Sequence, residues 1–300
     1  MKVSKTEKQK VVEPVVEKVS IPASQKIDGV WVPLPSRGVS YDGKTPNGKI
    51  LLRPPKVKDV KFLAQITAEN FTEVFESSLT AVLELLILDP KIDPWDLTNG
   101  DRMYLLLWVR TQIHPFYHMA VTCPYCMFPD KNYSYPLSNI AGRMLTDKYK
   151  GQVERKLSKL GPVVTLGLVT GRDECEVDQL AELKKYDRRV LRAAAAIKLV
   201  DGKPMSLEDK YGWLGELPGG DELEVKSWLY GIEHGPDYDN CSYKCSKCKG
   251  ESRIRIPFRP ELWYPSVPVD RDLGDAVDGG AVQSGGNLPG DVGSGTDGDR

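Results

Sequence analysis

The sequence predicts an α+β protein that has a helical body and short β hairpins. Three observations lead to this fold class. Two Cys-x-x-Cys pairs, Cys123–Cys126 and Cys245–Cys248, each stand between two short runs that are typical of strands. Long segments outside these hairpins repeat apolar residues at helical spacing. The chain has 300 residues, 40% of them hydrophobic, which suffices for one large or two small domains.

The N-terminal half is predicted to be mostly helical. Residues 1–26 mix Lys, Glu and Val without a sustained period, so we expect a flexible arm there. Residues 48–53 are typical of a strand, and the apolar spacing over residues 57–86 indicates a helical block. Cap residues then precede a very apolar helix at residues 103–112, which leads into the first hairpin.

The C-terminal half is predicted to combine helices with one strand before the second hairpin. We expect helices at residues 138–160, 177–200, 206–214 and 220–232, and a strand at residues 163–169. Residues 269–300 contain no aromatic residue and predict a disordered Gly/Asp-rich tail. Two related lobes follow from this pattern, at residues 27–136 and 137–268, each with one cysteine hairpin.

The two cysteine pairs predict a metal site. A strand, a tight turn and a returning strand present two sulfurs in one direction, so two such knuckles supply the four thiolates of a tetrahedral Zn²⁺ site. The expected ligands are Cys123, Cys126, Cys245 and Cys248. Four thiolates leave no open position for a substrate, which indicates a structural zinc ribbon joining the two halves. Metal binding would offset the entropy of closing so long a loop.

Other interpretations of these cysteines stay open. A four-thiolate site also suits iron. The Cys-Pro-Tyr-Cys pair is the redox motif of glutaredoxins, although Met127 to Asp130 is turn-like where those proteins begin a helix. The thiols could also be a disulfide or plain buried residues. Cys241 could replace Cys245, and His118 could replace a cysteine, but spacing favours the four named ligands.

Composition narrows the possible functions. The formal net charge is −1, so no general field attracts nucleic acid or an anionic membrane. Paired cysteines at metal-like spacing fit a reducing cytosol, and no apolar run reaches the length of a membrane span. The sequence lacks the nucleophile elbow, the phosphate-binding loop and the His-Glu-x-x-His motif. We therefore expect a non-enzymatic cytoplasmic protein without a membrane partner.

Two basic clusters bear on nucleic-acid binding. One lies on the second hairpin and consists of Lys244, Lys247, Lys249, Arg253 and Arg255. The other lies on the predicted helix at residues 177–200 and consists of Lys184, Lys185, Arg188, Arg189 and Arg192. Ordinary solvated faces explain both clusters more simply, so nucleic acid is an unlikely partner. A zinc-ribbon nucleic-acid-binding protein is the alternative function.

The order of several short motifs resembles a known family. Leu34-Pro35-Ser36-Arg37-Gly38 comes first, followed by Gly100-Asp101-Arg102 and Cys123-Pro124-Tyr125-Cys126. His234-Gly235-Pro236 and Cys245-Ser246-Lys247-Cys248 come later. This series, over about residues 30 to 265, resembles the base plate hub assembly family of T-even-type, contractile-tailed bacteriophages.

The resemblance implies a non-enzymatic assembly protein. Such a protein would scaffold or chaperone the assembly of the baseplate through contacts with other hub or wedge proteins. It would act in the host cytoplasm during assembly or remain in the tail baseplate of the virion. Aromatic residues near element ends, Trp31, Trp95, Trp228 and Trp263 among them, are candidate anchors for such partners. Residues 262–265 are the preferred exposed anchor.

Overall fold

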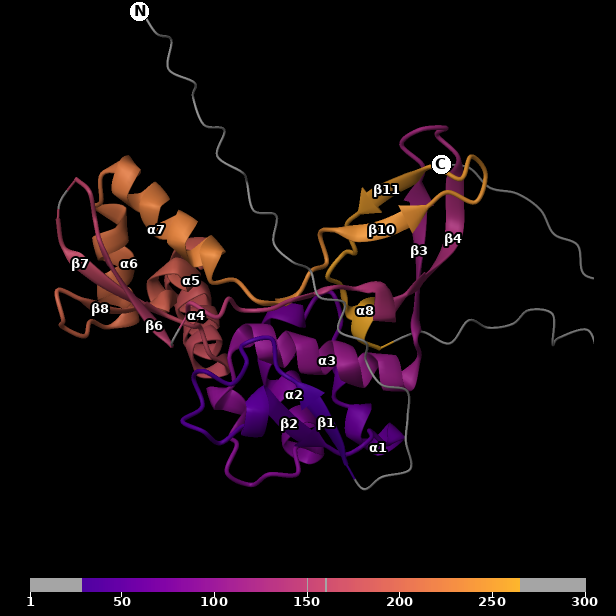
Figure 1. Cartoon of the computed structure of the whole chain (residues 1–300), viewed down its shortest axis with the longest axis horizontal. Helices are drawn as coiled ribbons and strands as arrows, with labels where there is room; N and C mark the ends of the chain where they lie inside the picture. The colour runs from indigo at the N-terminus through magenta and orange to yellow at the C-terminus, as the bar shows by residue number, and fades with distance from the viewer. Residues whose placement is uncertain (1–28, 150, 160, 265–300) are drawn as a thin grey trace, which may run out of the picture. The chain divides into compact units, whose positions relative to one another are not determined.

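The computed structural model of the chain describes residues 29–149, 151–159 and 161–264 (Figure 1). The arm predicted at residues 1–26 and the tail predicted at residues 269–300 lie outside the described residues. Short 3-10 helices carry the label η. The first elements are β1 (Val30–Pro33), η1 (Pro46–Gly48), β2 (Lys49–Leu52), α1 (Val57–Val60), η2 (Leu63–Gln65), α2 (Phe71–Leu86), η3 (Pro94–Asp96), α3 (Asn99–Ile113), β3 (Phe116–Thr122), β4 (Pro129–Pro136) and η4 (Leu137–Asn139).

The second part of the chain alternates helices with short strands. Its elements are β5 (Gly142–Arg143), β6 (Gln152–Lys156), β7 (Val163–Gly167), α4 (Gly171–Lys184), α5 (Arg188–Ala196), β8 (Ile197–Val200), α6 (Leu207–Gly215), α7 (Gly219–Gly231), β9 (Gly235–Pro236), β10 (Cys241–Lys244), β11 (Glu251–Ile254) and α8 (Pro260–Trp263).

All named strands pair antiparallel in small sheets. β6, β7 and β8 form a three-stranded sheet, and the others pair as β1–β2, β3–β4, β5–β9 and β10–β11. The combination of helices with small antiparallel sheets confirms the predicted α+β class. It also confirms the two hairpins, because β3–β4 and β10–β11 enclose the two Cys-x-x-Cys pairs.

Helix α3 is the most buried helix of the N-terminal part. The side chain of Thr98 caps it by accepting a hydrogen bond from the N–H of Asp101. Every residue from Tyr104 to Arg110 is buried, so this helix presents no solvated face over that stretch. Its apolar residues belong to a large cluster that also takes in Leu79, Leu83 and Ile50. The sequence prediction of a central helix here is confirmed.

The chain returns to this first cluster after residue 235. Its buried members from this part of the chain are Cys241, Ile256, Leu262 and Trp263. A second cluster, around α4 to α7, consists of apolar residues taken from between Leu157 and Leu229. The division of the chain into lobes near residue 136 stays a prediction, although residues from both sides of that position share the first cluster.

The helix predicted at residues 138–160 is wrong. Most of this stretch is extended or turn-like among its described residues, with β5 pairing to β9 and β6 pairing to β7. Gly151 has φ +106°, a left-handed conformation that ends any helix there. Leu145 and Tyr149 are buried against Leu168 without helical geometry, so the apolar spacing reflects burial of a loop.

The single helix predicted at residues 177–200 is also wrong in extent. Its first part is α4, which begins earlier because Thr170 and Asp173 form a capping box. Lys185 then adopts φ 59°, and the Asp187 side chain caps the new helix α5 through the N–H groups of Arg189 and Val190. The last four residues form β8 beside β7. The two shorter helices predicted next are confirmed as α6 and α7.

No helix within the described ranges is both long enough and apolar enough to cross a membrane.

Candidate metal centre

Each cysteine pair lies in a tight turn whose backbone holds both sulfurs on one side. In the first turn the N–H of Cys123 donates to the carbonyl of Phe128 at 3.0 Å, and the N–H of Met127 donates to the carbonyl of Cys123 at 2.9 Å. Met127 completes the turn with φ 56°, in the left-handed region. Such a turn brings the chain back for β4 after only a few residues.

The second turn repeats this hydrogen-bond pattern at the same offsets. The N–H of Cys245 donates to the carbonyl of Gly250 at 3.0 Å, and the N–H of Lys249 donates to the carbonyl of Cys245 at 3.1 Å. Lys249, four residues after Cys245, has φ 62°. The two turns therefore have equivalent backbone conformations, which sequence spacing alone had indicated.

The four sulfurs of the two turns lie together, all within 4.8 Å of one another. The sulfur of Cys123 is 3.7 Å from that of Cys248, and the sulfur of Cys126 is 3.7 Å from that of Cys245. Figure 1 shows the consequence, with β10 and β11 beside β3 and β4. These four cysteines could hold a metal ion.

The sulfur distances distinguish between the chemistries that sequence left open. A disulfide needs its sulfurs about 2.05 Å apart, so the four thiols are free. Tetrahedral coordination with metal–sulfur bonds of about 2.3 Å puts the sulfurs about 3.8 Å apart, close to the two cross-pair distances. The cluster is therefore sized for one ion. The redox arrangement of glutaredoxins does not apply to Cys123 and Cys126, because β4 follows them where those proteins have a helix.

Apolar side chains surround the cluster and hold the hairpins together. Cys123 and Cys245 are buried with Val121 and Tyr243 in a small cluster of their own. The rings of Tyr133 and Tyr243, one from each hairpin, meet edge to face with centroids 5.0 Å apart. Both this packing and a bound metal ion would hold the two hairpins together.

Close approach of the two turns requires a glycine. The Tyr125 hydroxyl donates to the Glu251 carbonyl at 2.9 Å, so the first turn contacts the second directly. A Cβ on Gly250 would lie 2.7 Å from the Tyr125 ring and 3.3 Å from the Cys248 sulfur. Only glycine leaves this space free.

Backbone N–H groups favour the thiolate form of one ligand. The N–H of Cys248 donates to the Cys245 sulfur at 3.5 Å, and this bond, opposed by burial and aided by Lys247, lowers the pKa of Cys245 to about 6. The pKa of Cys248 is raised to about 11, because a lowering hydrogen bond from Gly250 is outweighed by the sulfurs beside it. A bound cation would favour the thiolate at both positions.

The other candidate ligands lie elsewhere. Cys241 is buried next to the carbonyls of Asp237 and Tyr238, outside the four-sulfur cluster. His118 is exposed on β3 and forms a hydrogen bond with Ser134 at 3.0 Å. Cys175 lies on α4, half-buried.

The prediction that residues 262–265 form an exposed aromatic anchor is wrong for Trp263. Trp263 is fully buried, because α8 folds back and packs it against Phe75, Tyr238 and Phe258. Tyr264 is 40% exposed, and position 265 lies outside the described residues. Of the other named tryptophans, Trp31 is the exposed one, at 49%.

The short motifs that carry the family resemblance contact one another. Ser36 donates to the Asp101 carboxylate through both its N–H, at 2.8 Å, and its hydroxyl. The backbone of His234 and Gly235 crosses Gly100 so closely that a Cβ on Gly100 would lie 2.4 Å from the His234 carbonyl oxygen. These residues form one buried polar junction at the start of α3.

Sequence reasoning missed a cavity beside this junction. It is lined in part by Arg188, Arg189 and Arg192 of α5, which were expected on a solvated helix face. The helical spacing of the three arginines was the available signal. The other walls come from remote segments, so spacing alone could not reveal the cavity.

Comparison with protein families, with curated proteins and with solved structures gives no match to this chain. The resemblance to the base plate hub assembly family therefore rests only on the series of short motifs.

Proposed function

We propose that the four-cysteine cluster holds a structural Zn²⁺. The observation that supports this most is the pair of 3.7 Å sulfur–sulfur distances between hairpins, which suits metal–sulfur bonds of the length zinc forms. Zinc has no redox chemistry and no open coordination position in such a site, so its role would be to hold two remote hairpins together. Iron is the alternative ion for the same four thiolates.

Metal analysis tests this proposal. The purified protein should contain about one zinc per chain, and Cys245→Ser should abolish this content and lower the thermal midpoint, because one ligand is removed. Cys175→Ser is the matched control, since Cys175 lies outside the cluster, and it should retain the metal. Iron in place of zinc, or zinc retained in Cys245→Ser, would contradict the assignment.

We further propose that the protein is a non-enzymatic phage tail assembly protein. It would scaffold or chaperone baseplate assembly through contacts with hub or wedge proteins, in the host cytoplasm or in the finished baseplate. Support comes from the motif series, whose pieces Ser36, Gly100, Asp101 and His234 meet at one buried junction. Because these residues contact one another, proteins that share this fold would be expected to have all of them.

Recovery of the protein from infected cells tests the assembly proposal. A tagged copy should co-purify with baseplate hub or wedge proteins after nuclease treatment. Enrichment of nucleic acid instead, with no tail protein, would exclude an assembly role and support the alternative zinc-ribbon nucleic-acid binder.

Local ion pairs disfavour that alternative. On the second hairpin Lys244 pairs with Glu251 at 3.2 Å, and Arg255 pairs with Asp239 at 2.8 Å. Lys247 lies over the Phe128 ring, 5.6 Å from its centroid. Much of the basic cluster is thus neutralised or engaged within the protein. If nucleic acid does bind, Lys247→Ala and Arg253→Ala should weaken it and reduce its salt dependence.

A further inference from the structure

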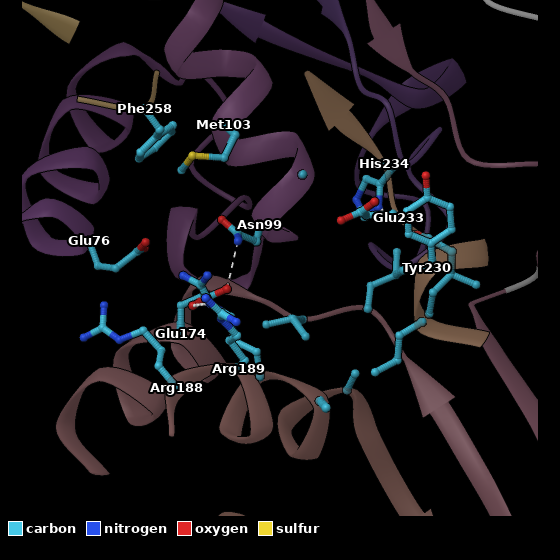
Figure 2. A pocket seen from close by; sticks show the side chains of 18 of the residues that line it. Glu76, Asn99, Met103, Glu174, Arg188, Arg189, Tyr230, Glu233, His234 and Phe258 are labelled. Atoms are coloured by element: carbon cyan, nitrogen blue, oxygen red, sulfur yellow. Dashed lines mark hydrogen bonds and ion pairs between the residues drawn. The ribbon is translucent and has the colours of Figure 1, made fainter. Parts of the chain in front are cut away.

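A cavity of about 840 Å³ lies against α2, α3, α5 and α7, on residues distinct from the four cysteines. Its volume falls in the range of natural ligand pockets. Figure 2 shows Phe258 and Met103 on one side of Asn99, and Tyr230, Glu233 and His234 on the other. The cavity is therefore lined by apolar side chains and by charged side chains.

One end of the cavity is apolar. Phe258 is 40% exposed, and its ring contacts those of Phe71 and Phe75, with centroids 5.6 Å and 5.4 Å apart. Met103 lines the same end and supplies a flexible, polarisable side chain. Such a surface gains most by covering an aliphatic or aromatic group.

The carboxylates of the cavity already have partners. Glu174 accepts from Asn99 Nδ2 at 2.8 Å with one oxygen and from Arg192 Nε at 2.8 Å with the other. Asp178 pairs with Arg188 at 3.2 Å, and the buried Glu76 pairs with Arg102 at 2.8 Å. The cavity thus has little acceptor capacity left for a cationic ligand.

Donor capacity remains. Arg189 is exposed, and its guanidinium has no partner among the described residues. Arg188 and Arg192 each pair with a single carboxylate, and a guanidinium has five N–H donors.

We propose that this cavity binds an extended peptide segment of a partner protein that bears apolar and acidic side chains. A carboxylate pairs with Arg189, and an apolar side chain covers the Phe258 end. The apolar end and the volume of the cavity favour a peptide over a simple anion, and the surplus of arginine donors selects acidic over basic segments. Neither the metal nor the phage assignment is a premise of this proposal.

Fluorescence anisotropy with a labelled peptide of alternating leucine and glutamate residues tests it. This peptide should bind, whereas a leucine–lysine peptide and a serine–glutamate peptide should not. Arg189→Ala should weaken binding about tenfold, the effect of losing one charge-assisted contact. Arg155→Ala is the matched control, since Arg155 is exposed on β6 outside the cavity, and it should bind as the wild type does.

Charge reversal sharpens the test. Arg189→Glu should lose the leucine–glutamate peptide and gain affinity for the leucine–lysine peptide, with an unchanged circular dichroism spectrum. Absence of binding, equal binding of acidic and basic peptides, or equal losses in Arg189→Ala and Arg155→Ala would each overturn the proposal.

Discussion

Arg102 is a fully buried cation at the start of α3. Its Nη2 pairs with Glu76 at 2.8 Å and donates to Thr80 Oγ1 at 2.9 Å, and its guanidinium lies 5.2 Å from the ring centroid of Trp95. Gly171, the first residue of α4, is directly against this group. Breaking a buried ion pair leaves an uncompensated charge, so side chains around Arg102 tolerate little change.

Gly171→Ala should therefore destabilise the protein by about 3 kcal/mol, because the new Cβ would lie 1.2 Å from Arg102 Nη1 and displace the guanidinium. Gly212→Ala in α6 is the matched control, since no atom of the described residues lies within 4 Å of its added Cβ. It should stabilise the protein by about 0.5–1 kcal/mol through helix propensity. Urea unfolding measures both, and equal effects would refute this account of Gly171.

Glu76 should make stability depend on pH. Burial, opposed by Arg102 and aided by Glu174 and Asp178, raises the pKa of Glu76 from 4.5 to about 7. Between these values the folded protein binds more protons than the unfolded chain, so the free energy of unfolding falls as pH rises. The loss attributable to this group is up to about 3 kcal/mol and is complete above pH 7.

Glu76→Gln isolates this contribution, because glutamine does not titrate. The difference in unfolding free energy between wild type and Glu76→Gln should change between pH 4.5 and 7.5. A constant difference over that range would show that Glu76 titrates normally.

At the scale of elements, α3 positions both sites. Its first turn places Asn99 at the cavity, and its last turn places Arg110, which donates to the carbonyls of Leu262 at 2.6 Å and Phe116 at 2.9 Å. Through these bonds α3 fixes α8 and the start of β3, the strand that ends at Cys123. A substitution in the first turn of α3 should therefore affect the cavity, and one in its last turn should affect the position of the first cysteine hairpin.

Thr98→Val tests the stability of the junction at the N-terminus of α3. The Thr98 hydroxyl caps Asp101 and forms hydrogen bonds with His234 Nε2 at 2.8 Å and Tyr41 Oη at 3.2 Å; the bond to His234 is partly buried and the other two are buried. Losing these bonds should cost about 2–3 kcal/mol in urea unfolding. Ser206→Ala, which removes an exposed cap of α6, should cost only about 1 kcal/mol. A smaller loss in Thr98→Val would contradict a buried junction.

At the scale of the whole molecule, the four sulfurs lie at a small apolar cluster that adjoins the large N-terminal cluster, because Met119, Tyr133 and Ile254 pack against both. The large N-terminal cluster contains α3, the second contains α4 to α7, and the cysteine hairpins have a small cluster of their own. Few buried residues surround the sulfurs themselves, so a metal ion would contribute much of the stability of the contact between the two cysteine turns.

Removing the metal with a chelator should therefore loosen the hairpins and spare the helices. Hydrogen exchange should rise over residues 116–136 and 241–254 and stay slow in α3 and α5. Adding back zinc should restore protection. Uniform loss of protection would instead show that the ion stabilises the entire fold. Unchanged protection would show that the ion does not hold the two hairpins together.

The sequence predicted some elements well and others poorly, for local reasons. Cap residues before a run of apolar residues are a helix signal, and they indicated α3, although the helix begins at Asn99 and not at residue 103. The helix predicted at residues 138–160 is absent, because loop residues such as Leu145 and Tyr149 are buried at a spacing like that of a helix. The break at Lys185 was missed, since a left-handed lysine has no sequence signature of its own.

The candidate sites divide in the same way. The sequence by itself determined the two cysteine turns, because a Cys-x-x-Cys pair with its flanking strands is a local unit of a few residues. Only the tertiary structure decided that sulfurs 119 and 125 residues apart lie 3.7 Å from each other, and that three arginines of α5 line a cavity with Phe258 and Asn99. Local hydrogen bonds and dihedral preferences act over a few residues, whereas these contacts depend on how all the helices pack.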